Sequence, residues 1–167
     1  EYMSTVYFWS DLHLGHKNIN NFRTQFEDER SHFEYIKARW KATVNKHDKV
    51  FILGDCCFTH EALAEFDTWT GRKVLILGNH DTDRKISLSD LVYVYDEIHS
   101  LYKHKEFWLS HAPIHPDELR GKLNIHGHTH NHVIDDSRYV NVCVEQFDKP
   151  VSIDTLRQII ANRAIDK

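Results

Sequence analysis

The stretch Val74-Leu75-Ile76-Leu77-Gly78-Asn79-His80-Asp81 decides the fold. Four apolar residues run without interruption, a glycine ends the run, and three polar side chains follow at once. A short apolar run bounded by glycine is typical of a strand that is covered on both faces. Open α/β sheets bind their ligands at the carboxyl ends of such strands. We therefore expect residues 79–81 to lie in a functional site, although an exposed tight turn would show the same local pattern.

The same pattern recurs at four other places in the chain. Apolar runs at residues 6–10, 50–54, 107–110 and 123–127 lead directly into Asp11, Asp55, His111 and His128. Five apolar runs that each end in a carboxylate, an amide or an imidazole are more than chance turns would give. We expect the ends of several strands to build one site.

Composition indicates a single packed domain over residues 3–167 of the 167. Hydrophobic residues make up 41% of the chain and aromatic residues 12%, which argues against disorder. No apolar run approaches the roughly 20 residues of a membrane helix, and no leader resembles a signal peptide. Glu1 and Tyr2 precede Met3 and are expected to be an expression remnant. No membrane partner is expected, and no oligomeric state is predicted.

Charge and cysteine content limit the setting and the partners. The net charge is −4 and the pI is near 6.4, so composition shows no basic face for a long nucleic-acid footprint. The three cysteines are an odd number, and Cys56 and Cys57 are adjacent. This pattern does not resemble a disulfide framework, so we expect free thiols and a cytoplasmic protein, with Cys143 in the core.

The order of the expected elements predicts the architecture. We expect helices at residues 27–44, 60–69 and 84–91 and a final helix after Ser152, with Thr59 capping the second one and Gly71 ending it. Expected strands cover residues 5–10, 50–53, 73–77, 92–101, 105–110, 123–126 and 139–144, with residues 92–110 forming a hairpin. The chain begins β-α-β-α-β and ends in consecutive strands, which favours two mixed sheets with helices outside.

Ligand-type residues recur at a spacing of two. Asp11-x-His13 and His128-x-His130 each place two such side chains on the same side if the segment is extended. Carboxylate, imidazole and amide ligands suit Mn, Fe, Zn, Co or Ni. Together with Asp55, Asn79 and His111, these two motifs make seven ligand-type residues. Seven ligands exceed what one open catalytic ion needs, but they suit two ions that share a carboxylate.

The ordered set of motifs resembles the calcineurin-like metallophosphoesterases, and its surroundings resemble a small single-domain branch found in bacteria and phages. The family pattern is D-x-H, G-D, G-N-H-[D/E], H and G-H-x-H. This chain carries each part in order: Asp11-Leu12-His13, Gly54-Asp55, Gly78-Asn79-His80-Asp81, His111 and Gly127-His128-Thr129-His130. The resemblance implies an α/β (α+β) fold, the four-layer αββα sandwich of two mixed β-sheets flanked by helices.

The resemblance also implies a role for each motif residue. One metal ion would be held by Asp11, His13 and His130, and a second by Asn79, His111 and His128, with Asp55 bridging the two. A metal-bound hydroxide would attack phosphorus in line, and His80 would assist the leaving group. Asp81 would hold the ring of His80 in the useful tautomer. Mn is the expected metal, with Fe, Ni, Zn and Co as alternatives.

The expected reaction is phosphodiester hydrolysis rather than phosphomonoester hydrolysis. The segments between motifs are too short for a capping domain, and no Arg or Lys lies within a metal motif to bind a dianionic monoester. A small phosphodiester, a cyclic nucleotide or a nucleic-acid end is the expected substrate. His16 and Arg23 are candidates to contact it, although a lone Arg or Lys in a loop is usually solvated.

Two other functions fit parts of the pattern. A non-catalytic interaction scaffold on the same fold would have lost ligands or the catalytic histidine, whereas this chain keeps every one. A metal-dependent hydrolase of the β-lactamase type would need H-x-H-x-D-H, and residues 126–132 lack the aspartate.

Overall fold

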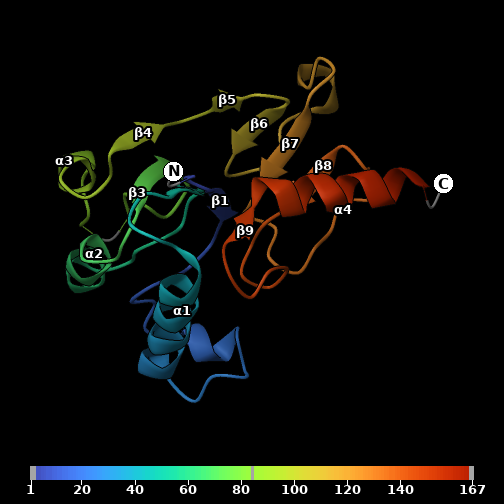
Figure 1. The fold of residues 1–167 in the computed structure, drawn as a ribbon. Helices are drawn as coiled ribbons and strands as arrows, with labels where there is room; N and C mark the ends of the chain where they lie inside the picture. Colours follow the sequence, from blue (N-terminus) through green and yellow to red (C-terminus); the bar gives the residue numbers. More distant parts are fainter. Residues whose placement is uncertain (1–2, 84, 166–167) are drawn as a thin grey trace.

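Two mixed β-sheets form the centre of the protein in a computed structural model, which describes residues 3–83 and 85–165 (Figure 1). The first sheet has the strand order β4-β3-β2-β1-β9, and the second has the order β5-β6-β7-β8. The two mixed sheets predicted from the element order are therefore confirmed. The suggested remnant at residues 1–2 lies outside the described residues.

The first sheet is mostly parallel. β1 (Val6–Trp9), β2 (Lys49–Ile52), β3 (Arg72–Ile76) and β4 (Glu97–His99) run in the same direction, and β9 (Val151–Ser152) pairs antiparallel with β1. The predicted strands at residues 5–10, 50–53 and 73–77 agree with β1, β2 and β3 to within about a residue at most ends. Because these strands are parallel, their carboxyl ends lie at the same edge of the sheet.

The second sheet corrects the predicted hairpin. β5 (Tyr102–His104) pairs antiparallel with β6 (Phe107–Ser110), while β7 (Leu123–His126) and β8 (Tyr139–Asn141) continue the sheet in parallel. The prediction that residues 92–101 pair with residues 105–110 is wrong, because β4 belongs to the first sheet. Residues 100–101 carry the chain from one sheet to the other.

The helices begin at polar capping residues. α1 (Glu29–Thr43), α2 (His60–Asp67) and α3 (Leu88–Val92) start after Asp28, Thr59 and Ser87, whose side chains accept backbone hydrogen bonds. α4 (Ile153–Ile165) follows Ser152, whose Oγ accepts from the Thr155 amide at 3.1 Å. The structure confirms the predicted caps at Thr59 and Ser152. The helix expected at residues 84–91 begins only at Leu88, and Arg84 lies outside the described residues. Two short 3-10 turns, η1 (Ile19–Asn21) and η2 (Pro116–Glu118), lie in loops.

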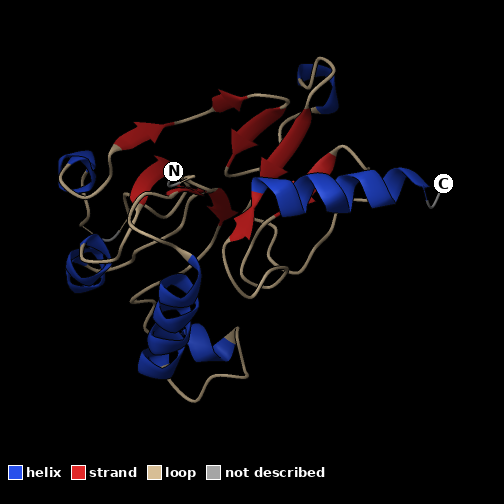
Figure 2. Ribbon diagram, viewed as in Figure 1, coloured by secondary structure: helices blue, strands red, loops and turns tan. Residues whose placement is uncertain are grey.

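Two hydrophobic cores cover the two faces of the first sheet. Phe8 and Phe51 belong to the core shared with the second sheet, whereas their neighbours in sequence, Trp9 and Ile52, belong to the core under α1 and α2. Burial on both faces explains why these strands are continuous apolar runs. The helices lie outside the two sheets in Figure 2. α4 crosses the amino-terminal ends of β6 and β8, where Arg157 pairs with Glu106 and Arg163 donates to the Tyr139 carbonyl.

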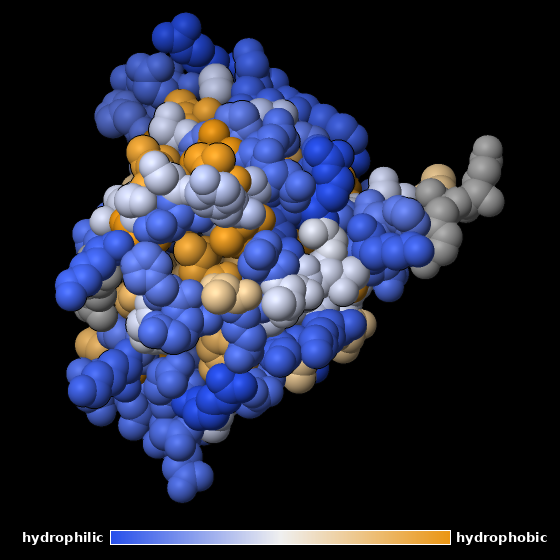
Figure 3. All heavy atoms as spheres, turned by 90° about the vertical axis from the view of Figure 1, so that its left-hand side faces the viewer, coloured by the Kyte–Doolittle hydropathy of each residue, from blue (hydrophilic) through white to orange (hydrophobic). Residues whose placement is uncertain are grey.

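The surface on the side of α3 is mostly hydrophilic around an apolar area (Figure 3). Leu88 and Val92 of α3 are more than half exposed. Among the described residues, no helix is both long enough and apolar enough to span a bilayer.

Candidate metal centre

The carboxyl ends of five strands meet at one edge of the sandwich. Asp11, Asp55 and Asn79 follow β1, β2 and β3 of the first sheet, while His111 and His128 follow β6 and β7 of the second. Parallel strands deliver these side chains to the same edge. The structure thus brings together the polar residues that follow the five apolar runs, as the sequence predicted.

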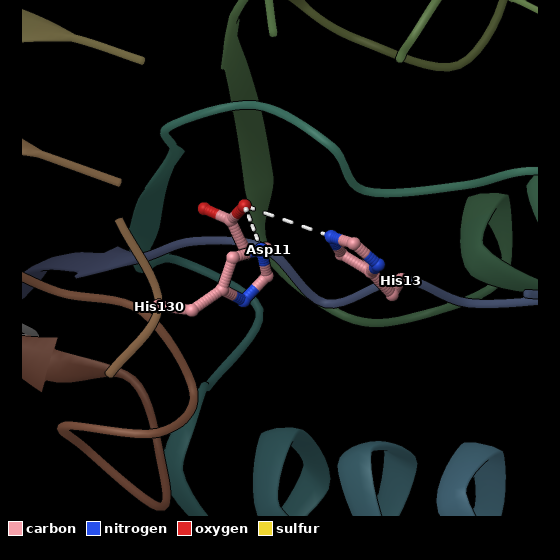
Figure 4. Close-up of side chains that lie close together, drawn as sticks. All are labelled: Asp11, His13 and His130. Atoms are coloured by element: carbon pink, nitrogen blue, oxygen red, sulfur yellow. Dashed lines mark ion pairs between the residues drawn. The ribbon is translucent and has the colours of Figure 1, made fainter. Parts of the chain in front are cut away.

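A first cluster consists of Asp11, His13 and His130, whose ligand atoms all lie within 4.8 Å of one another. Asp11 Oδ1 lies 3.6 Å from His13 Nε2 and 3.4 Å from His130 Nε2 (Figure 4). Asp11 Oδ1 and His13 Nε2 are buried without a hydrogen-bond partner in the described part of the chain. A buried polar atom without a partner is unfavourable, and a cation between these atoms would satisfy both.

A second cluster consists of Asp55, His111 and His128, whose ligand atoms also lie within 4.8 Å of one another. His111 Nε2 lies 3.3 Å from Asp55 Oδ2 and 3.1 Å from His128 Nδ1. The side-chain oxygen of Asn79 lies 2.8 Å from the same His111 nitrogen. The four residues therefore offer oxygen and nitrogen atoms around one position.

Asp55 lies between the two clusters. Its Oδ2 is 4.0 Å from His13 Nε2 and 3.3 Å from His111 Nε2, so one carboxylate oxygen faces both groups. The other oxygen, Oδ1, accepts a hydrogen bond of 2.8 Å from the His80 amide, which fixes the carboxylate. This arrangement suits a ligand shared by two ions.

The backbone is strained at five of these residues. Asp11, His13, Asp55, His128 and His130 have φ between 47° and 69°, and they are five of the eight non-glycine residues with positive φ in the described ranges. Such conformations are unfavourable by about 1–3 kcal/mol each and concentrate at functional sites. The strain corrects the assumption that the D-x-H and H-x-H segments are extended. His128 and His130 turn into different clusters because the backbone between them is not a strand.

Two motif glycines are required by close packing. A Cβ at Gly127 would lie 2.0 Å from Ser10 Oγ and 2.4 Å from Asp11 Oδ2. A Cβ at Gly78 would lie 2.3 Å from Asp55 Oδ1. These glycines let the backbone approach the carboxylates, which explains why the apolar runs end in glycine there.

Hydrogen bonds behind the clusters orient the histidines. His111 Nδ1 lies 2.7 Å from the Leu53 carbonyl oxygen, so Nδ1 donates and Nε2 faces the second cluster. His130 Nδ1 lies 3.0 Å from Glu145 Oε1, which leaves Nε2 facing Asp11. Contacts of this kind fix the tautomer and the ring orientation of a metal-binding histidine.

Glu145 lies outside every motif, so the motif pattern does not identify it. It directly follows the apolar run at residues 139–144, so the rule that found the other strand ends could also have found it.

Arg23 lies beneath the D-x-H loop. Its Nη2 donates to the Asp11 carbonyl oxygen at 2.5 Å, its Nε donates to Glu145 Oε1 at 2.8 Å, and its Nη1 lies 2.8 Å from His32 Nε2. The side chain is only 3% exposed. Its guanidinium is occupied in holding the loop, while Arg23 also lines the neighbouring cavity, and its predicted role as a substrate contact stays a prediction.

Asp81 supports the backbone rather than the ring of His80. Its buried carboxylate accepts hydrogen bonds from the amides of Asp55, Cys56 and Gly78 at 3.0, 3.0 and 2.7 Å. The prediction that Asp81 holds the His80 ring is therefore wrong, since these three amides occupy it. Asp83 takes that position, because its Oδ2 lies 2.7 Å from His80 Nδ1.

The charges of the clusters suit cations. Burial alone would raise the pKa of Asp11, but His13, His111 and hydrogen bonds lower it overall. Burial alone would lower the pKa of His111, but the hydrogen bond and charge of Asp55 together with the charge of Asp11 raise it to about 9. The carboxylates therefore stay ionised and draw positive charge toward them. Divalent ions fit this donor set.

A cavity of about 420 Å³ opens beside the first cluster. Its lining includes His13, His16, Phe22, His80, His130 and Asn131. His80 projects here with a side chain that is 41% exposed. His16 is in a position to meet a bound substrate, and its predicted role as a substrate contact stays a prediction.

Sequence comparison finds two similar phage proteins, while no family model matches the chain. The Gene 66 protein of Mycobacterium phage L5 is 29% identical over an alignment of 196 positions, which covers 95% of each chain. The Gene 66 protein of Mycobacterium phage D29 is 30% identical over an alignment of 195 positions, which covers 95% of this chain and 96% of the relative.

Two solved structures share the architecture. The protein of unknown function AQ665 from Aquifex aeolicus is 26% identical, with a TM-score of 0.73 over 94% of this chain and 100% of its own. The Pseudomonas putida nuclease MPE is 22% identical, with a TM-score of 0.53 over 75% of this chain and 61% of its own. The second likeness concerns the fold alone.

Proposed function

Because the chain belongs to the same family as the Gene 66 protein of Mycobacterium phage D29 and has a metallophosphoesterase-like fold, we propose that it is a phosphoesterase that uses two divalent metal ions. The observation that carries this proposal is the position of Asp55. One oxygen of its carboxylate faces His13 Nε2 at 4.0 Å and His111 Nε2 at 3.3 Å. Each of these histidines belongs to a separate group that could hold an ion.

The ligands divide between the two groups. In this proposal Asp11, His13 and His130 hold one ion, and Asn79, His111 and His128 hold the other, while Asp55 serves both. Two such ions would supply positive charge to the phosphate and a nucleophile at neutral pH. Mixed carboxylate, imidazole and amide ligands support Mn as the metal, with Fe, Ni, Zn and Co as alternatives.

His80 is proposed to protonate the leaving oxygen. Its ring lines the cavity. We assign His80 to neither metal ion, so its ring is available to act as the acid. Asp83 Oδ2 lies 2.7 Å from His80 Nδ1, which orients the ring and leaves Nε2 as the nitrogen that can donate to the substrate.

The cavity supports a diester substrate rather than a monoester. Among the described residues that line it, Arg23 is the only Arg or Lys, and it is paired with Glu145. A dianionic monoester would need further cations, whereas a diester carries one negative charge. Small diesters, cyclic nucleotides and nucleic-acid ends are the substrates to test. Nucleic-acid ends are included because the fold is similar to that of the Pseudomonas putida nuclease MPE.

We also propose one domain over residues 3–167 and a cytoplasmic setting. Both sheets contribute to one shared core, which supports a single domain. All three cysteines are free and buried, which supports a reducing compartment.

Metal analysis and matched aryl esters test the function. The protein would be stripped with a chelator, reloaded with Mn, and analysed for metal per chain. We expect two ions per chain and a higher kcat/KM for bis(p-nitrophenyl) phosphate than for p-nitrophenyl phosphate. One ion or fewer in active protein would contradict the two-metal site, and a monoester preference would contradict the substrate class alone. Two bound ions without hydrolysis of any ester would favour a scaffold.

A further inference from the structure

Phe22 is a large aromatic side chain left exposed beside the metal centre. It is 73% exposed, and it lines the same cavity as His13 and His130 of the first cluster. Apolar surface exposed at the rim of a cavity is typical of a binding site rather than of a random surface position. An aromatic face there can cover a flat group of a ligand.

The backbone fixes Phe22 in this exposed position. Ile19 on one side is 1% exposed, and Arg23 on the other side is 3% exposed. The amides of Phe22 and Arg23 both donate to the Ile19 carbonyl oxygen, at 3.0 and 2.7 Å. Arg23 also donates to the Asp11 carbonyl oxygen. Phe22 is therefore held at a set position relative to the metal-binding loop and cannot turn into the core.

A row of aromatic rings leads from the first cluster to Phe22. The ring centroids of His13 and His16 are 5.4 Å apart, and those of His16 and Phe22 are 5.7 Å apart with planes inclined by 24°. His16 and Phe22 are stacked and together form what we call the aromatic platform. Both rings line the cavity that lies beside the first cluster.

We propose that the aromatic platform stacks on the base of the nucleotide whose phosphate lies at the metal centre, so the substrate class is a nucleotide diester with an unpaired base. This inference rests on the proposed phosphoesterase function. Every base has a flat π-face, and stacking on an aromatic side chain contributes about 1–3 kcal/mol per base without sequence preference. A base within a duplex is covered on both faces, so a single-stranded end or a dinucleotide fits the platform.

The charges around the cavity agree with recognition of a base rather than of a polyanionic backbone. Arg23 is the only Arg or Lys of the described lining, and its guanidinium is occupied. Binding to a long nucleic acid depends on several phosphate contacts from Lys and Arg. Stacking on one base next to the scissile phosphate needs none of them.

Two ligands that differ only in the base test the proposal. Thymidine 5′-monophosphate and 2-deoxyribose 5-phosphate would be titrated calorimetrically into Mn-loaded wild type, Phe22→Ala, Phe22→Leu and Phe22→Trp. We expect wild type to bind the base-bearing ligand about 5- to 150-fold more tightly. Phe22→Ala and Phe22→Leu should bring this ratio close to one without changing the affinity for the sugar phosphate, whereas Phe22→Trp should keep it.

A matched control removes an exposed aromatic elsewhere. Tyr93 is 87% exposed and is not among the described residues that line the cavity, so Tyr93→Ala should keep the ratio. A ratio of one in wild type, an equal weakening of both ligands in Phe22→Ala, or a full ratio in Phe22→Leu would overturn the proposal. Loss of the ratio in Tyr93→Ala would do the same. Thermal melts should show all four variants as stable as wild type, since both positions are exposed.

The two proposals fail in different ways. Protein that hydrolyses bis(p-nitrophenyl) phosphate but shows no preference for the base refutes the platform alone. Protein whose preference for the base depends on Phe22, but which hydrolyses no phosphate ester, refutes the phosphoesterase function alone.

Discussion

Glu145 Oε1 lies 3.0 Å from His130 Nδ1 and so faces the side of the ring opposite the first cluster. The same oxygen accepts from Arg23 Nε at 2.8 Å. Burial alone would raise the pKa of Glu145, but His130 and Arg23 lower it to about 2. A charged carboxylate therefore holds the His130 ring with Nε2 toward Asp11.

Substituting Glu145→Gln should weaken metal binding. The amide would keep the shape of the side chain but lose the charge that orients His130, and loss of such a partner typically lowers metal affinity about 10- to 100-fold. Competition with a chromogenic chelator would measure the affinity. Asp148→Asn is a matched control, because Asp148 is 65% exposed and pairs with Arg39 away from the site. Equal affinities in wild type and Glu145→Gln would contradict the assigned role.

Asp55→Asn and His80→Ala should separate metal binding from proton transfer. Asp55 faces both clusters, so an amide there should lower the affinity for both ions. His80 lies outside both clusters, so its removal should leave two ions bound and lower kcat by on the order of 10²–10⁴. Elemental analysis and turnover of one aryl diester would measure the two effects. Loss of metal from His80→Ala would show that the assignment of roles is wrong.

The central strands could be predicted from the sequence because burial on both faces leaves a plain signal. The apolar run at residues 123–126 coincides with β7, and the polar residues after each run do meet at one edge. The short strands could not be assigned in this way. Residues 97–99 and 102–104 have similar β-forming patterns, yet they belong to different sheets because tertiary contacts decide the pairing. β9 has only two residues and leaves almost no pattern.

Side-chain partners at the site were harder to predict than its position. Asp81 follows His80 in sequence, but its carboxylate accepts hydrogen bonds from three backbone amides, which belong to Gly78, to Asp55 with its left-handed backbone, and to Cys56. Asp83, two residues further, reaches the His80 ring instead. Which groups a carboxylate contacts depends here on the backbone conformation of two loops at once. A sequence pattern along one segment does not reveal that conformation.

Gly127→Ala should disrupt the first cluster. The new Cβ would lie 2.0 Å from Ser10 Oγ, and Ser10 cannot easily move because its hydroxyl lies within hydrogen-bonding distance of both Asp11 Oδ2, at 2.6 Å, and the Leu53 carbonyl oxygen, at 2.8 Å. We expect weaker metal binding and a loss of about 1–3 kcal/mol in the free energy of unfolding. Gly121→Ala is the control, since its Cβ would meet nothing within 4 Å and only its positive φ would be strained. Urea unfolding and metal titration of both variants would decide, and normal metal binding in Gly127→Ala would refute the close packing.

The three cysteines should be free but slow to react in the folded protein. All are buried, and burial raises the pKa values of Cys57 and Cys143, which leaves little reactive thiolate. The sulfur atoms of Cys56 and Cys57 lie 3.7 Å apart without a bond. Titration with a chromogenic disulfide should find three thiols in denaturant and almost none within minutes in buffer. One thiol in denaturant would indicate a disulfide and contradict the reducing setting.

His32 should make the metal-free protein sensitive to mild acid. The side chain is fully buried with Nε2 2.8 Å from Arg23 Nη1, and burial, together with the Arg23 charge, lowers the pKa of His32 from 6.5 to about 3. Between these two values the unfolded chain binds a proton that the folded protein does not, so stability falls as the pH drops from 6.5 toward 3. By pH 4.5 the loss should be on the order of 2 kcal/mol.

The variant His32→Gln tests this origin of the acid sensitivity. Glutamine can still accept a hydrogen bond from Arg23 but cannot take up a proton. In the presence of a chelator, which removes pH-dependent metal binding, the free energy of unfolding of His32→Gln should depend less on pH between 6.5 and 4.5 than that of wild type. The same slope in His32→Gln and wild type would show that another group takes up the proton.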